Sequence, residues 1–154
     1  MYDIEKELAL YKLRNAEIKD KELMIQEIKL GDNFAPISYE SRVQTTSKGT
    51  GAEKDLETID RLRREIKRMK IANKRVDIIL SILREDREEF VRKYKIEKYS
   101  NSKIERMYDI SESTRKKWWK DSLRDMNKFI ENRCYFDTSK KRPKIVDLVT
   151  DINP

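Results

Sequence analysis

Hydrophobic residues recur at helical spacing along most of this chain. Between Tyr2 and Leu30 there is no glycine or proline, and apolar residues are separated by charged ones. The apolar residues that recur at this spacing are Ile4, Leu8, Tyr11, Ile18, Ile25 and Ile28. Their spacing predicts a long amphipathic helix over about residues 2–30, ending in a left-handed cap at Gly31.

A second segment without helix breakers carries a coiled-coil pattern. Thr50 and Glu53 have the spacing of a capping box, and we expect the helix to cover about residues 53–83. Its seam positions alternate in steps of three and four and comprise Ile59, Leu62, Ile66, Met69, Asn73, Val76, Leu80 and Leu83. Asn73 either fixes the register as a buried residue or lies half exposed near the end of the pairing.

The simplest arrangement packs these two helices together as an antiparallel hairpin over residues 1–84, serving as a scaffold or an interaction arm. The alternative is that two copies of the chain associate through the same seam. The segment 31–52 between the helices contains all three glycines of the chain and reads as a loop. Residues 133–154 form a tail with the basic run Lys140-Lys141-Arg142, either extended or lying back on the helices.

After Arg84 the pattern shortens into three smaller helices. We expect the first around Phe90, a second capped by Ser100 or Asn101, a tight turn at Asp109, and a third from Glu112 to about residue 132. Residues 85–132 are thus predicted to form a helix-turn-helix domain, and the whole chain is predicted to be all-α. Four residues fall on the inner side of this motif, namely Ile104, Tyr108, Ile110 and Trp118. Trp118 and its neighbour Trp119 are expected in the core or at its edge rather than stacked on bases.

Composition narrows the function. Of 154 residues 42% are charged and 37% are apolar, and the net charge of +7 favours a polyanionic partner. There is no histidine and only one cysteine, which argues against a disulfide framework, a Cys/His zinc site and a histidine general base. We therefore expect a non-enzyme without metal or cofactor. No apolar stretch is long enough to cross a membrane and no signal peptide is evident, so a cytoplasmic protein is expected.

The predicted third helix carries the candidate chemistry. No acidic residue occurs between Ser113 and Lys120, so positive charge is concentrated where a second helix would meet double-stranded DNA. The candidate DNA-binding residues are Ser111, Glu112, Ser113, Arg115, Lys116, Lys117 and Lys120. Among them Glu112, Ser113 and Lys116 are expected to read base edges. The alternative is a solvated basic helix end in an ordinary three-helix bundle.

These residues support a resemblance. Residues 83–127, which include Tyr-Ser-Asn-Ser-Lys-Ile-Glu-Arg-Met-Tyr-Asp-Ile-Ser-Glu-Ser-Thr-Arg-Lys-Lys-Trp-Trp, resemble the fourth conserved region of sigma factors. Two long helices, a loop with Ile37-Ser38-Tyr39-Glu40 and this C-terminal motif resemble the ArpU/RinA-type phage late transcriptional regulators. The chain departs from the motif at Glu105, where alanine is usual, at Asp109, where glycine is usual, and at Arg115, where an apolar residue is usual.

The resemblance implies a phage or prophage activator that binds duplex DNA upstream of late genes and meets host RNA polymerase. Two other classes remain. A small terminase-like packaging subunit would use the same motif and form a ring through its helical hairpin. A helical protein-binding adaptor would show no affinity for DNA at moderate salt.

Overall fold

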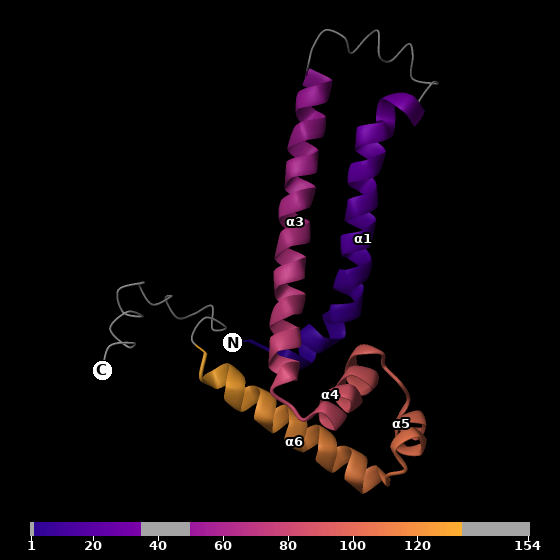
Figure 1. Cartoon of the computed structure of the whole chain (residues 1–154), viewed down its shortest axis with the longest axis vertical. Helices are drawn as coiled ribbons and strands as arrows, with labels where there is room; N and C mark the ends of the chain where they lie inside the picture. Colours follow the sequence, from indigo (N-terminus) through magenta and orange to yellow (C-terminus); the bar gives the residue numbers. More distant parts are fainter. Residues whose placement is uncertain (1, 35–49, 134–154) are drawn as a thin grey trace, which may run out of the picture. The chain divides into compact units, whose positions relative to one another are not determined.

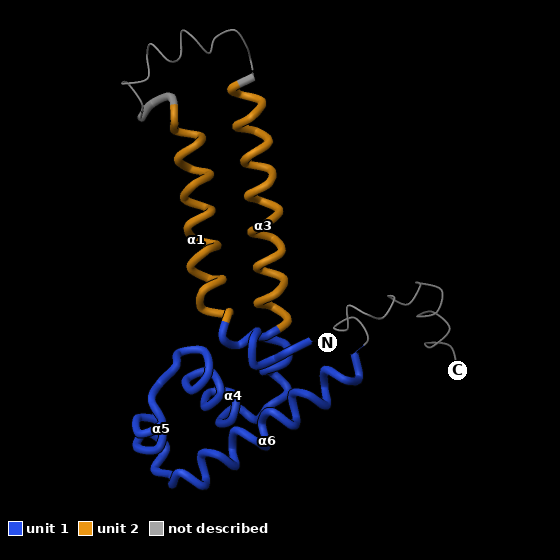
Figure 2. Tube along the Cα trace, turned by 180° about the vertical axis from the view of Figure 1, so that it is seen from behind, with its two compact units in different colours: residues 1–9, 76–154 blue, residues 10–75 orange. Residues whose placement is uncertain are grey.

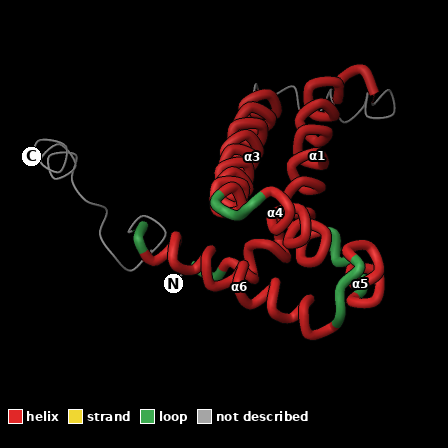
Figure 3. Tube along the Cα trace, turned by 60° about the horizontal axis from the view of Figure 1, so that its bottom comes forward, coloured by secondary structure: helices red, strands yellow, loops and turns green. Residues whose placement is uncertain are grey.

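All regular secondary structure in the described part of the chain is helical. The computed structural model describes residues 2–34 and 50–133, and every regular element in these two ranges is a helix (Figures 1 and 3). The prediction of an all-α chain is confirmed for these residues. Most of the predicted loop 31–52, including Ile37–Val43, and the tail from Cys134 onward lie outside them. In the described helices no segment combines the length and apolar content that a membrane span requires.

No strand occurs among the elements of residues 2–34 and 50–133. They are α1 (Ile4–Phe34), α3 (Thr50–Ser81), α4 (Glu85–Val91), the π-helical turn η3 (Arg92–Ile96), α5 (Asn101–Tyr108) and α6 (Glu112–Glu131). The predicted end of the first helix is wrong, because α1 continues through Gly31 to Phe34 and no described glycine has a positive φ. A single glycine costs a helix only about 1 kcal/mol relative to alanine, which the preceding turns can offset.

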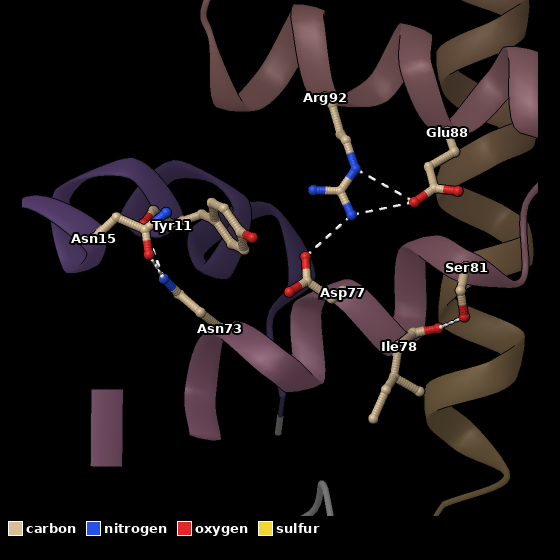
Figure 4. Close-up of polar contacts among 8 residues, drawn as sticks. All are labelled: Tyr11, Asn15, Asn73, Asp77, Ile78, Ser81, Glu88 and Arg92. Atoms are coloured by element: carbon tan, nitrogen blue, oxygen red, sulfur yellow. Dashed lines mark hydrogen bonds and ion pairs between the residues drawn. The ribbon is translucent and has the colours of Figure 1, made fainter. Parts of the chain in front are cut away.

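Contacts divide the chain into two compact units (Figure 2). One contains residues 10–75, and the other contains residues 1–9 together with residues from 76 onward. This division differs from the expected boundary at residue 84, since the last turns of α3 belong with the shorter helices. Asp77 of α3, for example, accepts a hydrogen bond of 3.0 Å from Arg92 of η3 (Figure 4).

In the unit of residues 10–75, α1 and α3 lie side by side and run in opposite directions (Figure 1). Their shared core consists of Ile18, Ile25, Ile59, Leu62 and Ile66, with Ile28 and Met69 packed against it. All of these had been assigned to the inner faces by their spacing. Ion pairs flank the core on its surface, from Lys21 to Glu65 at 3.2 Å and from Lys70 to Glu22 at 3.3 Å.

Asn73 is the polar member of this seam. It is 5% exposed, which settles the choice between a buried and a half-exposed position. Its Nδ2 donates to the backbone oxygen of Tyr11 at 3.1 Å and to Oδ1 of Asn15 at 2.9 Å (Figure 4). A shifted pairing of the two helices would leave this buried amide without its acceptors, so Asn73 favours the observed register.

In the other unit the buried hydrophobic side chains come from the start of α1, the end of α3 with the loop just after it, and the four shorter elements. They comprise Ile4, Leu8, Val76, Ile79, Leu80, Leu83, Phe90, Val91, Ile96, Ile104, Met126 and Ile130. The π-helical turn fits this burial, because Val91 and Ile96 are five residues apart and both are buried. An i→i+5 hydrogen bond of 2.9 Å, from the amide of Glu97 to the carbonyl of Arg92, spans the same turn.

Candidate nucleic-acid interface

A short loop joins α5 to α6 (Figure 3), and its first residue, Asp109, has a left-handed backbone conformation. Ser100 caps α5 by accepting a hydrogen bond of 3.2 Å from the amide of Lys103, and the helix ends at Asp109 with φ 50° and ψ 53°. The amide of Ile110 then donates to the carbonyl of Glu105 at 2.9 Å. Helix, left-handed residue and second helix therefore follow one another in the order that a helix-turn-helix requires.

Ser111 begins the second helix. Its Oγ accepts a hydrogen bond of 3.2 Å from the amide of Thr114, and it lies 3.0 Å from the hydroxyl oxygens of Ser113 and Thr114. Ser111 is thus an N-cap, as expected from its place after the turn. The start of α6 presents exposed hydroxyls and free backbone amides, a combination that suits phosphate oxygens.

The lysines of α6 are exposed along its first turns. Lys116 donates to Glu112 at 3.0 Å, with the two side chains 66% and 65% exposed. The hydrogen bond from Lys116 holds the pKa of Glu112 below its ordinary value. Lys117 and Lys120 are exposed and form no ion pair with any described residue. Among the lysines in the first turns of α6, Lys117 and Lys120 can bind an anion without giving up a described ion-pair partner.

Arg115 does not fit its predicted role. The residue is 5% exposed, its Nε donates to Oε1 of Glu105 at 3.1 Å, and its Nη1 donates to the hydroxyl of Tyr94 at 2.7 Å. Burial alone would lower the pKa of the guanidinium, but its partners, Glu105 first among them, hold this pKa above the ordinary value. Arg115 therefore joins α6 to α5 and η3, and we remove it from the DNA-facing set.

Two of the departures from the sigma-like motif thus explain each other. Glu105 and Arg115 occupy positions where the motif has a small and an apolar residue, and here they form one ion pair in the interior between α5 and α6. The pair replaces apolar packing with charge-assisted hydrogen bonds. The third departure, Asp109, holds the left-handed conformation for which glycine is usual.

An aromatic cluster fixes α6 against the other helices of its unit. Phe90 of α4 lies 5.5 Å from the ring of Trp118 and 6.0 Å from that of Tyr108, both edge to face. Tyr94 makes a similar contact with Trp119 at 6.2 Å. Trp118 and Trp119 are half-buried, so the prediction that they lie at the edge of the core is confirmed.

Replacing Asp109 with glycine is expected to raise the free energy of unfolding by about 0.5–1 kcal/mol, because the left-handed region costs an L-residue energy that glycine does not pay. Urea denaturation followed by tryptophan fluorescence measures the change. Asp109→Ala is the matched control and should be less stable than the wild type. A glycine variant less stable than the wild type would show that the Asp109 side chain contributes more than the strain costs.

A second group of exposed basic side chains lies on α3, outside α5 and α6. It includes Arg61, Arg64 and Arg68, which were not among the predicted DNA-binding positions. The signal was present in the sequence as an uneven distribution of charge along one helix. In the described part of the chain, no His, Cys, Asp and Glu side chains cluster in a way that could hold a metal ion.

Comparison of this chain with known proteins identifies no relative. No protein-family model, curated protein or solved structure matches this chain. The candidate interface is therefore defined by its geometry and charge alone: a capped helix after a left-handed turn, with Ser113, Lys116, Lys117 and Lys120 on its exposed side.

Proposed function

We propose that this chain is a sequence-specific, double-stranded DNA-binding transcription regulator in which α6 enters the major groove. The observation that carries the proposal is the α5–turn–α6 geometry with unpaired lysines on the exposed side of α6. In a helix-turn-helix the first turns of the second helix meet base edges, and phosphates flank them. Glu112, Ser113 and Lys116 are then placed to read bases, while Lys117 and Lys120 contact phosphates.

The sigma-like resemblance makes the proposal more specific. A phage or prophage late-gene activator would bind upstream of its target genes in the cytoplasm of the bacterial host and meet RNA polymerase there. The long pair of helices α1 and α3 would supply the scaffold of such a regulator. The Asn73 contact supports this role, because it favours one register of the hairpin.

The proposal is tested by DNA binding. The probes are the DNA upstream of the chain's own gene and a scrambled duplex, each at two salt concentrations. Lys117→Ala/Lys120→Ala is compared with the wild type, and Lys19→Ala/Lys29→Ala on α1 serves as a control with the same change in charge. The wild type should prefer the upstream DNA, and the α6 variant should lose about two units of salt slope.

The other classes predict different outcomes. A ring of many subunits, seen by mass measurement, would favour a packaging subunit. Failure of the wild type to bind any duplex would favour a protein-binding adaptor. A wild type that binds both duplexes equally, or an α6 variant indistinguishable from the wild type, would contradict α6 as the recognition helix.

A further inference from the structure

The positive charge of this chain is concentrated in one part of α3. The segment 61–75 contains eight basic residues against a single acidic one, Glu65, and its net charge of +7 equals that of the whole chain. All other residues together are therefore neutral on balance. The excess of basic residues is therefore larger on α3 than on α6.

Most of these charges have no ion-pair partner among the residues that the structure describes. Glu65 is bound by Lys21, and Lys70 of the segment is bound by Glu22. Six other side chains are exposed and form no ion pair with any described residue; we call them the α3 basic stripe: Arg61, Arg63, Arg64, Lys67, Arg68 and Lys74. Their positive ends face solvent, while the opposite face of α3 packs on α1 through Leu62 and Ile66.

The stripe weakens the helix that carries it. Arg64 and Arg68 are four residues apart, as are Arg63 and Lys67, and like charges at this spacing destabilise a helix. Like charges at a spacing that destabilises the helix are expected where the surface binds a partner. The partner must be anionic, because only an anion relieves the repulsion.

The spacing and the residue types fit a chain of phosphates. Arg61, Arg64 and Arg68 follow one line along α3, and the stripe from Arg61 to Lys74 is roughly 20 Å long at ~1.5 Å per residue. Arginine binds phosphate oxygens through two parallel hydrogen bonds, and four of the six residues are arginines. Duplex DNA offers one negative charge per ~1.7 Å of its axis, enough to engage several of them at once.

An acidic protein fits this surface less well. Protein interfaces are centred on buried aromatic or apolar anchors and are depleted of charge at their core. The stripe contains no aromatic residue, and Ile71 is the single apolar side chain exposed along this segment of α3.

We propose that the α3 basic stripe is a second duplex-binding surface, which holds DNA by its phosphates without reading its sequence. The choice of DNA rests on the proposed function, but the stripe does not need α6 in order to bind. The two surfaces would then contribute differently to DNA binding. Helix α6 would select the DNA sequence, and the α3 basic stripe would supply affinity that depends strongly on salt.

The test measures binding of the full chain to a fluorescent scrambled duplex by anisotropy, between about 50 and 200 mM salt. The test variant is Arg61→Gln/Arg64→Gln/Arg68→Gln. Lys6→Gln/Lys19→Gln/Lys29→Gln on α1 is the control with the same loss of charge. Glutamine is a good helix former and relieves the repulsion, so the stripe variant should melt no lower than the wild type.

We expect the stripe variant to lose about 2.7 units of the slope of log K against log salt, or ~0.9 per phosphate contact, while the control loses less than one. Equal losses in the two variants would mean that only net charge matters and would overturn the proposal. A stripe variant that binds like the wild type would also overturn it, as would a wild type that binds no scrambled duplex, which would leave the stripe to an acidic protein.

The α6 variant Ser113→Ala/Lys116→Ala, which changes two of the proposed base-reading residues, is measured on the upstream and the scrambled duplex and separates this inference from the proposed function. If it keeps the wild-type preference for upstream DNA while the stripe variant loses salt slope, the stripe binds DNA and α6 is not the recognition helix. If the preference is lost in the α6 variant and the stripe variant is unchanged, α6 reads DNA and the stripe does not bind it.

Discussion

Replacing Glu105 with alanine is expected to lower the free energy of unfolding by about 2–4 kcal/mol, a large effect for a side chain on a short helix. The reason is its partner. The Arg115 side chain is 6% exposed and would keep its charge after losing the carboxylate 3.1 Å away, with the Tyr94 hydroxyl as its remaining hydrogen-bond partner. The Glu105 side chain is 27% exposed, which places the expected cost below that of a fully buried pair. Urea denaturation monitored by tryptophan fluorescence gives the value.

The double variant Glu105→Ala/Arg115→Leu completes the experiment. It replaces the ion pair with the small and apolar residues that the sigma-like motif has at these positions, and an ion pair exchanged for apolar packing is often neutral in stability. We expect most of the lost stability to return, with a coupling energy of about 1–3 kcal/mol between the two positions. Glu105→Gln, which keeps a hydrogen-bond acceptor, should lose less than Glu105→Ala. Additive losses in the two single variants would contradict the pairing of these residues.

The Glu105–Arg115 pair also shows what could not be predicted from the sequence, namely whether Arg115 is exposed or buried. Glu105 and Arg115 both depart from the sigma-like motif, and the sequence predicts Arg115 to contact DNA because it lies in the stretch without acidic residues between Ser113 and Lys120. Whether an arginine on α6 faces solvent or the interior depends on the partner that α5 and η3 bring to it. That information lies in tertiary contacts, which a count of charges along one helix does not contain.

Local periodicity, in contrast, was sufficient to predict which residues α1 and α3 bury against each other. Every seam position predicted on α3 is buried or half-buried, and so are the matching positions on α1. A repeat of three and four residues places side chains on one stripe of a helix whatever the partner is, so the assignment needed no tertiary information. The environment of Asn73 did need it, because its acceptors Tyr11 and Asn15 come from the other helix.

The basic stripe was missed for a different reason. Its charge is visible in the sequence, but a helix-turn-helix motif predicts DNA contacts only for its second helix, here residues 111–120. A running count of charge along the chain would have identified segment 61–75 without any structure. The structure adds that the seam uses one face of α3 and leaves these side chains on the other, without ion-pair partners among the described residues.

Replacing Phe90 with alanine is expected to have the largest effect on stability, a loss of about 3–5 kcal/mol. Phe90 is fully buried, and its ring contacts those of Tyr94, Tyr108 and Trp118, which belong to η3, α5 and α6. Removing it deletes one side of each contact and leaves a cavity between elements that are too short to be stable alone. Because both tryptophans of the chain lie on α6, the fluorescence midpoint in urea reports this unit.

Phe90→Leu is the matched control, since it keeps most of the apolar volume and loses only the edge-to-face contacts. We expect it to lose clearly less stability than Phe90→Ala and to keep selective DNA binding, which Phe90→Ala should lose once α6 is no longer held in place. If Phe90→Ala lowers the fluorescence midpoint no more than Phe90→Leu does, the aromatic cluster does not hold α6 against α4 and α5. Selective binding by an unfolded Phe90→Ala variant would in turn mean that the lysines of α6 need no helix-turn-helix to find their site.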